Sequence, residues 1–352
     1  MTRALRIAVV AGDGIGPEVT RVALRVLQQV SASSGREIQF QEFPFGADHY
    51  LRTGVTLPPE TLEEWKGFDA IFMGAFGDPR VPDMRHAADI LLGTRFQLDL
   101  YANVRPVRCL DDRLCPLKGK TSGDVDMVVF RENTEGLYVG MGGNFKKGSA
   151  DEIAIQEDLN TRKGVERIIR KAFDHAVAHQ KSKVVMSDKA NVLTYGHDLW
   201  QRVFRDVGAQ YPGIEASHLY VDVLAMQMLR RPEAFQVIVT CNMFGDIVTD
   251  LGAALQGGLG MAASGNIHPG QISMFEPVHG SAPKYAGEDV ANPMGAVLTA
   301  ALMVEHLGEE TMAAHIERAV KKCIQSGRTT RDLGGVLGTR AVGEAICSAL
   351  ED

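Results

Sequence analysis

The chain has 352 residues, of which 45% are hydrophobic and 23% are charged, and its formal net charge is −7. This composition is ordinary for a folded globular protein, and the length predicts two domains or one large α/β unit. The negative charge argues against a nucleic-acid or anionic-membrane partner, but it is compatible with a local basic pocket for a small acidic substrate.

The N-terminal segment and the cysteines indicate a cytoplasmic protein. Residues 1–10 hold too short an apolar run for a signal peptide and lead directly into a predicted strand. No stretch is long enough to span a bilayer. The five cysteines form an odd set without CxxC spacing, so neither a disulfide framework nor a zinc site is expected.

Short apolar runs alternate along the chain with longer segments of helical periodicity, which predicts an α/β architecture. Residues 140–155 interrupt this alternation with glycines and lysines and predict a protruding hairpin arm that clasps a second subunit, with a flexible loop as the alternative. The predicted strands are 7–11, 70–73, 127–130, 184–186 and 237–240, and the predicted helices include 19–32, 161–179, 193–207 and 294–307.

A glycine-rich turn, GDGIGPE at 12–18, follows the first predicted strand and opens a helix at Pro17. A dinucleotide-binding Rossmann turn requires G-x-G-x-x-G, and here the third glycine comes one residue early. The turn therefore does not indicate a Rossmann fold, although it would let a ligand approach the backbone closely.

Three arginines follow apolar runs in the central part of the chain: Arg95, Arg105 and Arg131. Guanidinium groups at the ends of buried elements hold carboxylates in bidentate fashion, so the set suits a substrate with two acid groups. Taken singly, each is more often a structural ion pair.

Two acids four residues apart, Asp246 and Asp250, follow the predicted strand 237–240 and precede an Ala/Leu/Gly-rich segment, 251–259, that continues as a helix. On a helix they lie one turn apart near the carboxyl end of a strand, where hard oxygen ligands suit Mg²⁺ or Mn²⁺. The alternative is a solvated helix face that carries two unrelated acids.

Two further segments carry chemistry. Lys189 follows a predicted strand that ends at Met186, and a partly buried lysine near a cation is a candidate general base or proton relay. The Gly/Pro-rich loop 276–287 presents backbone amides and His279 to an adenosine-like ligand. A surface lysine and an ordinary ordered loop are the alternatives.

Together these motifs resemble, at close to full length, the metal-dependent β-decarboxylating dehydrogenases of (R)-hydroxyacids. That family holds isocitrate, 3-isopropylmalate, homoisocitrate, tartrate and D-malate dehydrogenases. The matching blocks are GDGIGPE at 12–18, LDLYANVRPV at 98–107, RENTEGLY at 131–138, DKANV at 188–192, NMFGDIVTD at 242–250 and EPVHGSAP at 276–283.

The resemblance implies an isopropylmalate dehydrogenase-like α/β/α fold with two domains, not an ordinary Rossmann fold. Residues 1–100 and 257–352 are expected to form a discontinuous cofactor-binding domain. Residues 101–256 are expected to form a central domain with the dimerisation arm, about 140–156, and the metal and substrate site. A homodimer with shared active sites is implied, in which Lys189 and Asp222 complete the partner's site.

The resemblance also implies the roles of individual residues. Asp222, Asp246 and Asp250 would hold Mg²⁺ or Mn²⁺, and Lys189 would relay the substrate's hydroxyl proton while hydride passes to the nicotinamide. Tyr138 would help to protonate the enolate left by decarboxylation. The substrate-binding set is Leu91, Leu92, Arg95, Arg105 and Arg131, and the cofactor-binding set is Ile15, Ala75, His279, Gly280, Ser281, Ala282, Lys284, Tyr285 and Asn292.

The segment before Arg95 bears on which small dicarboxylate hydroxyacid is the substrate. Leu91 and Leu92 form an apolar wall, and Asp89 would repel a third carboxylate, so 3-isopropylmalate or a similar alkylmalate is favoured. Ala88 replaces an acid typical of isopropylmalate dehydrogenases, and RENTEGLY is typical of other members. D-malate, tartrate, isocitrate and homoisocitrate therefore stay open.

The cofactor signals are divided. Lys284 and Tyr285 resemble the pair that grips the 2′-phosphate in NADP-dependent isocitrate enzymes, whereas TRDLGG at 330–335 resembles the NAD type. NAD is favoured, with NADP as the alternative. A non-catalytic regulatory subunit is the alternative of another class, but it is disfavoured because Tyr138, Lys189 and the three acids are all present.

Overall fold

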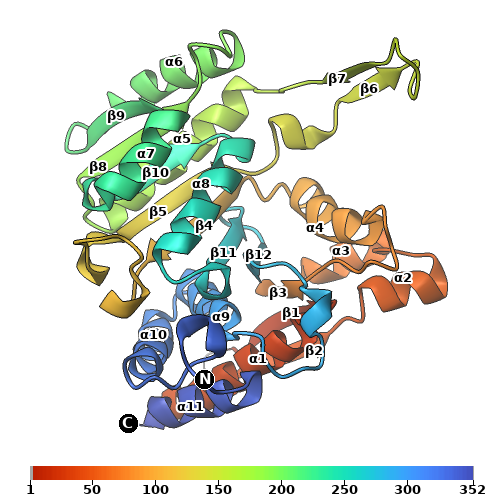
Figure 1. Ribbon diagram of the computed structural model, residues 1–352, viewed down its shortest axis with the longest axis vertical. Coiled ribbons are helices and arrows are strands. Elements are labelled where there is room, and N and C mark those ends of the chain that lie inside the picture. The colour runs from red at the N-terminus through yellow and green to blue at the C-terminus, as the bar shows by residue number, and fades with distance from the viewer. Residues whose placement is uncertain (1–2, 352) are drawn as a thin grey trace. The chain divides into compact units, whose positions relative to one another are not determined.

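The computed structural model describes residues 3–351, which divide into two compact units (Figure 1). Of the described residues, the first unit comprises 3–100, 106–123 and 253–351, and the second comprises 101–105 and 124–252. Among residues 3–351, none of the helices combines the length and apolar character that a membrane span requires.

The first unit contains a five-stranded arrangement in the order β2-β1-β3-β12-β11. The pairs β1–β2, β1–β3 and β3–β12 are parallel, and β11 runs antiparallel to β12. The strands are β1 (Leu5–Gly12), β2 (Ile38–Glu42), β3 (Ala70–Ala75), β11 (Ala263–Ile267) and β12 (Ser273–Pro277). The helices are α1 (Gly16–Ser34), α2 (Ala47–Thr53), α3 (Pro59–Trp65), α4 (Arg85–Gln97), α9 (Met294–His306), α10 (Glu310–Gln325) and α11 (Thr339–Glu351).

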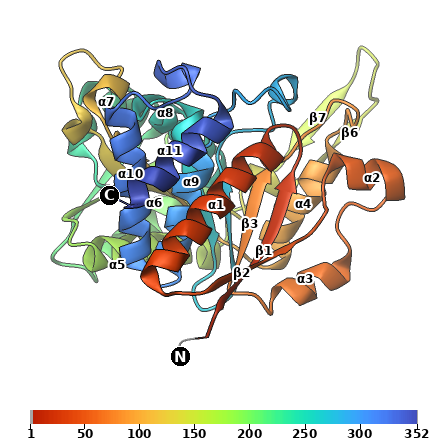
Figure 2. The ribbon, with the colours of Figure 1, turned by 90° about the horizontal axis from the view of Figure 1, so that it is seen from below.

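Alternating residues of β1 divide the core of the first unit into two layers. Ile7 and Val9 face the cluster formed with α1, α9, α10 and α11, whereas Ala8 and Val10 face the cluster that includes Trp65 of α3. Figure 2 shows the helices of the first cluster, α1, α9, α10 and α11, beside the strands. Helix α1 ends at Gly35, whose φ of 71° is the left-handed conformation that closes many helices.

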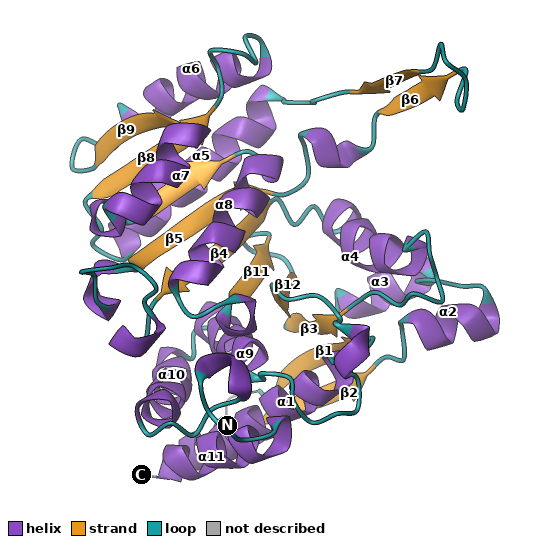
Figure 3. Ribbon diagram, viewed as in Figure 1, coloured by secondary structure: helices purple, strands orange, loops and turns teal. Residues whose placement is uncertain are grey.

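The second unit contains parallel strands in the order β5-β10-β8-β9 (Figure 3). Helix α5 packs on β5, β10 and β8 and against α6, while α7 packs on β8 and β9. The strands are β5 (Asp126–Glu132), β8 (Lys183–Asp188), β9 (Glu215–Tyr220) and β10 (Val237–Thr240). The helices are α5 (Arg162–Ala178), α6 (Gly196–Gly208), α7 (Val221–Arg230) and α8 (Asn242–Leu255). Strand β4 (Ala102–Arg108) and α8 contribute residues to both units.

The predicted arm is an antiparallel hairpin of β6 (Gly142–Phe145) and β7 (Ile153–Gln156), and it extends away from the rest of the second unit (Figure 1). Phe145, Ile153 and Ile155 on the hairpin are all more than half exposed. An isolated two-stranded hairpin with such apolar side chains is stabilised by a covering surface.

The strand predictions are confirmed, whereas the helix predicted to continue to residue 259 is wrong at its end. Helix α8 stops at Leu255, because Gly257 and Gly258 adopt φ values of 112° and 107° that a helix does not contain. Helix α8 begins at Asn242, so Asp246 and Asp250 both lie on it, as predicted.

Candidate active site

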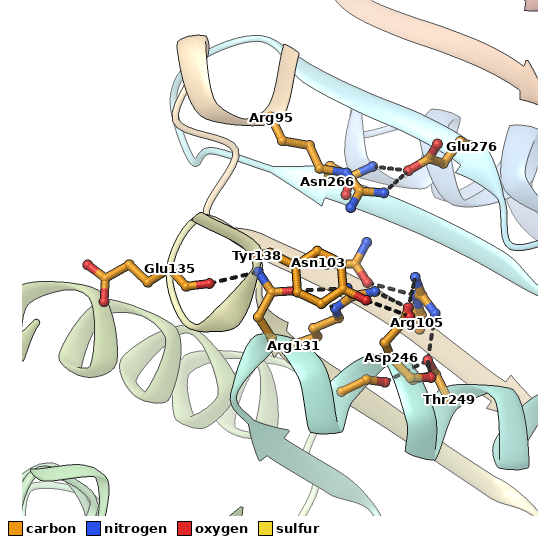
Figure 4. A network of polar contacts seen from close by, with 12 residues as sticks. Arg95, Asn103, Arg105, Arg131, Glu135, Tyr138, Asp246, Thr249, Asn266 and Glu276 are labelled. Atoms are coloured by element: carbon orange, nitrogen blue, oxygen red, sulfur yellow. Dashed lines mark hydrogen bonds and ion pairs between the residues drawn. The ribbon is translucent and has the colours of Figure 1, made fainter. Parts of the chain in front are cut away.

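Asp246 is the centre of a polar cluster in the second unit (Figure 4). It lies on the second turn of α8, which begins two residues after the buried strand β10. Its Oδ1 accepts from Arg131 and, at 3.4 Å, from Nη2 of Arg105, and its Oδ2 accepts from the Tyr138 hydroxyl at 2.9 Å. The structure thus brings together two predicted substrate residues, one predicted catalytic residue and one predicted metal ligand.

Asp250 lies one helical turn beyond Asp246 and is exposed. Its pKa is raised by partial burial and then by the negative charge of Asp246, against which Arg105 and Arg131 act in the opposite direction. Its carboxylate and that of Asp246 are hard oxygen donors one helical turn apart, and such a pair fits a divalent cation such as Mg²⁺ or Mn²⁺.

The two arginines are held by neutral side chains as well as by Asp246. On β4, Arg105 donates from Nε to Asn103 at 2.7 Å and from Nη1 to Thr249 at 2.6 Å. On β5, the side chain of Arg131 is 1% exposed, and its guanidinium lies over the Tyr138 ring at 5.0 Å from the centroid. These contacts fix the guanidinium planes, as recognition of a carboxylate requires.

Tyr138 reaches Asp246 from a short 3-10 turn, Leu137–Val139, that follows β5. The pKa of the Tyr138 phenol is raised, mainly by burial. The charge of Arg131 acts in the opposite direction, and the charge of Asp246 and the hydrogen bond to it add to the rise. The phenol therefore carries its proton at neutral pH.

Lys189 and Asp222 form a second cluster in the same unit. Lys189 follows the end of β8, Asp222 lies in the first turn of α7, and Nζ donates to Oδ1 at 2.8 Å. That hydrogen bond lowers the pKa of Asp222. Within residues 3–351 no three His, Cys, Asp or Glu side chains are grouped so as to hold a metal ion. Asp222 is thus not grouped with Asp246 and Asp250 as a third ligand in this chain.

In the first unit, Arg95 of α4 pairs with Glu276 at the end of β12 over 2.6 Å, and both side chains are 9% exposed. Asn266 of β11 donates to the same carboxylate oxygen at 2.9 Å. Leu91 and Leu92 precede Arg95 on α4, but Leu91 packs against the core cluster of Trp65 and its neighbours. Leu91 and Leu92 are both partly buried, and the predicted wall of two leucines stays a prediction.

The glycine turn packs against the chain's own backbone. A Cβ atom on Gly14 would lie 2.1 Å from the carbonyl oxygen of Ser281, and Ile15 donates its N–H to that oxygen at 2.8 Å. A Cβ atom on Gly12 would lie 2.1 Å from the carbonyl oxygen of Ala75. The turn therefore joins β3 to the loop after β12, which brings predicted cofactor residues Ile15, Ala75 and Ser281 together.

His279 has a buried Nε2 without a hydrogen-bond partner among the described residues, while Nδ1 contacts the Gly280 carbonyl oxygen at 3.1 Å. Burial lowers the pKa of His279, so the ring is neutral at pH 7. A buried nitrogen of this kind fits a ligand hydroxyl or amide. Gly280 is exposed, and Ala282, at φ 38°, precedes the turn that carries Lys284 and Tyr285.

Lys284 and Tyr285 are exposed, with Nζ 4.6 Å from the centre of the ring. Asn292 is buried, accepts from the Met294 N–H at 2.9 Å and donates to Asp332 at 3.0 Å. Asn292 is therefore tied to the TRDLGG segment, which contains Asp332.

Several residues of these clusters were not predicted from the sequence: Asn103, Thr249, Asn242, Asn266, Glu276 and Asp332. Asn242 and Glu276 stand inside motifs that were recognised, but their roles depend on partners more than 100 residues away. No local pattern signals such contacts.

Each of the two units is an α/β structure that contains a cluster of acids and arginines. A family model described as isocitrate/isopropylmalate dehydrogenase matches residues 6–346. The chain belongs to this family and is a dehydrogenase. The predicted family and fold class are thereby confirmed.

Similar proteins support the assignment over the full length. A protein of Thermobifida fusca named 3-isopropylmalate dehydrogenase is 46% identical over 352 residues, covering 99% of each chain. One of Streptomyces griseus with the same name is 45% identical, covering 97% of this chain and 99% of its own. The crystal structure of isocitrate dehydrogenase from Methylococcus capsulatus has a TM-score of 0.90 and 36% identity, covering 99% of this chain and 100% of its own.

Proposed function

We propose that this protein catalyses the metal-dependent, NAD-linked oxidative decarboxylation of 3-isopropylmalate to 2-oxoisocaproate and CO₂. The observation that carries the proposal is the convergence of Arg105, Arg131 and Tyr138 on Asp246, beside Asp250. Relatives at 42–46% identity that bear the name 3-isopropylmalate dehydrogenase favour this member of the family.

The guanidinium groups of Arg105 and Arg131 bind and orient the substrate's carboxylates, and Arg95 belongs to the same set by the family resemblance. Asp246 and Asp250 would hold Mg²⁺ or Mn²⁺, which when bound would polarise the hydroxyacid as a Lewis acid. The substrate's own carboxylates compensate the guanidinium groups.

Lys189 and Asp222 act in the partner's site of a homodimer, as the family resemblance implies. Lys189 relays the proton of the C2 hydroxyl to solvent by giving up one of its own protons as it receives the new one. Asp222, whose pKa is lowered by its hydrogen bond to Lys189, stays ionised and would be the third metal ligand. Tyr138 donates its proton to the enolate carbon after CO₂ leaves. The exposed apolar side chains of the β6–β7 hairpin support its use as the dimer arm.

NAD is the proposed hydride acceptor, and the buried unpartnered Nε2 of His279 fits one of its hydroxyl or amide groups. The exposed pair of Lys284 and Tyr285 keeps NADP as the alternative. We place the enzyme in the cytoplasm, without a nucleic-acid or membrane partner. D-malate, tartrate, isocitrate and homoisocitrate remain the alternative substrates.

The test is the initial rate of NAD⁺ and NADP⁺ reduction with Mg²⁺ or Mn²⁺ on 3-isopropylmalate, D-malate, tartrate, isocitrate and homoisocitrate. We expect the highest kcat/KM with 3-isopropylmalate and NAD⁺. Asp246→Asn is expected to reduce kcat by at least about 1000-fold, because the cation loses its central ligand. Metal-independent turnover, or an active Asp246→Asn variant, would contradict the proposed role of the acid pair.

A further inference from the structure

We propose that Asn242 is a positioning residue that fixes the guanidinium of Arg131 for the substrate and ties it to the loop that carries Tyr138. This inference rests on the proposed function for its catalytic consequence, but the geometry is independent of it. Asn242 opens α8, four residues before Asp246, and it is 1% exposed.

Both ends of the Asn242 amide are occupied. Its Oδ1 accepts from Nη2 of Arg131 at 2.8 Å and from Nε at 3.1 Å, and its Nδ2 donates to the carbonyl oxygen of Glu135 at 3.0 Å. The guanidinium requires an acceptor and the carbonyl requires a donor, so the orientation of the amide is determined. Asn242 thus connects the loop after β5 to the side chain of Arg131.

The choice of a neutral amide has an electrostatic consequence. An aspartate at this position would accept the same two N–H groups but would neutralise the guanidinium and add a third negative charge near Asp246 and Asp250. Asn242 fixes the plane of Arg131 without adding a negative charge beside the Asp246 carboxylate with which Arg131 already pairs.

Gly245 supplies a second, steric restraint on the same arginine. A Cβ atom there would lie 2.4 Å from Cγ and 2.6 Å from Cβ of Arg131, so the aliphatic part of the side chain rests directly on the helix. Asn242, Gly245 and Asp246 are spaced i, i+3 and i+4 and therefore share one face of α8. Arg131 lies along that face, where its aliphatic part contacts Gly245 and its guanidinium donates to the Asn242 amide and to the Asp246 carboxylate.

The other side of the loop is held independently of Arg131. Glu135 accepts from the Thr161 N–H at 2.8 Å and from the Thr161 hydroxyl at 2.5 Å, and Glu132 accepts from the N–H groups of Thr134 and Glu135. Loss of the Asn242 amide should therefore release Arg131 and loosen the approach of Tyr138 without unfolding the loop.

The test compares Asn242→Ala and Gly245→Ala, which disturb Arg131 from two directions. We expect each to raise KM for the hydroxyacid about 10- to 100-fold, because an oriented hydrogen bond to a charged group is lost or displaced. KM for the nucleotide should change less than about threefold, since the hydrogen bonds of the Asn242 side chain go to Arg131 and Glu135 and not to a predicted cofactor residue.

Gln236→Ala is the matched control. Gln236 is another amide of the second unit, and its Oε1 accepts from the N–H groups of Ser182 and Lys183 at 2.8 Å and 3.1 Å. We expect this variant to lower the melting temperature and leave both KM values unchanged. If Asn242→Ala instead changes stability and both KM values together, its role is merely structural and the inference is wrong.

A second measurement separates this inference from the proposed function. The ¹⁵Nε–H signal of Arg131, assigned by its loss in Arg131→Lys, should exchange slowly with solvent in the wild type and rapidly in Asn242→Ala. If no hydroxyacid is turned over by the wild type, the proposed function fails and this signal alone decides the positioning role. Slow exchange that persists in Asn242→Ala, or an unchanged hydroxyacid KM in an active enzyme, overturns the inference.

Discussion

The hydroxyl of Tyr138 donates to Oδ2 of Asp246 over 2.9 Å, on the carboxylate whose Oδ1 receives Arg131. The proposed proton donor and the central metal ligand are therefore in direct contact. Their separate roles can be tested by removing the phenol oxygen alone.

Tyr138→Phe should leave the metal affinity within about threefold of the wild type, because Asp246 keeps both arginines. It should lower kcat by about 100-fold, the range expected for loss of a general acid. Steady-state kinetics and Mn²⁺ titration measure the two effects. A parallel loss of Mn²⁺ affinity would show that Tyr138 acts by shaping Asp246 instead.

Asp250→Asn should make the metal-free protein slightly more stable at neutral pH. The pKa of Asp250 is raised by burial and by Asp246, so the folded protein favours the protonated carboxyl. The contribution of this group to the free energy of unfolding is therefore complete at low pH and is lost as the pH rises through the raised pKa. Because the side chain is well exposed, we expect a gain of only about 0.5 kcal/mol, or 1–2 °C.

The same variant should lose its response to the metal. Thermal unfolding with increasing Mg²⁺ should raise the melting temperature of the wild type, because the ion binds the folded state, and leave Asp250→Asn unchanged. A variant that is destabilised without metal and still stabilised by Mg²⁺ would refute the assignment of Asp250 as a ligand.

The sequence predicts the local parts of this site better than the contacts that complete it. Strand β10 and the i, i+4 spacing of Asp246 and Asp250 follow from apolar runs and helical period, and both are confirmed. The pairing of Arg95 with Glu276 joins positions 181 residues apart, and it depends on where β12 ends in the sheet. Only the folded chain specifies such a contact.

The glycine turn shows a second kind of limit. Its spacing correctly argues against a Rossmann turn, but sequence does not reveal what approaches the glycines. The close neighbours are the carbonyl oxygens of Ala75 and Ser281, so Gly12 and Gly14 are required for packing between segments of the first unit. Whether a small residue admits a ligand or another loop is decided by tertiary structure.

Leu91 and Leu92 should separate into a core residue and a specificity residue. Leu91 packs against the cluster that includes Trp65, so Leu91→Ala should cost about 1–3 kcal/mol of unfolding free energy. Leu91 and Leu92 lie four and three residues before Arg95, so both share a helical face with it, and Leu91 is in addition packed against the core. Leu92→Ala should cost less than about 1 kcal/mol but lower the preference for isopropylmalate over D-malate by about tenfold.

Urea unfolding and kcat/KM ratios on the two substrates measure these effects. Each leucine variant serves as the control for the other, since the side chain removed is the same. Equal losses of specificity in both variants would contradict the division that the packing of Leu91 predicts.

His175 should make the second unit sensitive to mild acid. It stacks on His179 at 3.9 Å between ring centres and lies 5.0 Å from the Phe130 ring. Burial, followed by the charge of His179 and nearby lysines, lowers the pKa of His175 from 6.5 to about 4. Because the neutral form is favoured in the fold, its stabilising contribution is present above pH 6.5 and is lost as the pH falls towards 4.

Between pH 7.5 and pH 5.0 the wild type should therefore lose about 1–2 kcal/mol more unfolding free energy than His175→Phe, which keeps an aromatic ring but cannot be protonated. Urea unfolding at a fixed protein concentration measures the difference. His315→Gln, which removes an exposed histidine from α10 of the first unit, should follow the wild type. If His175→Phe is as sensitive to acid as the wild type, His175 is not the group whose protonation destabilises the fold. The variant has no imidazole at this position to take up the proton.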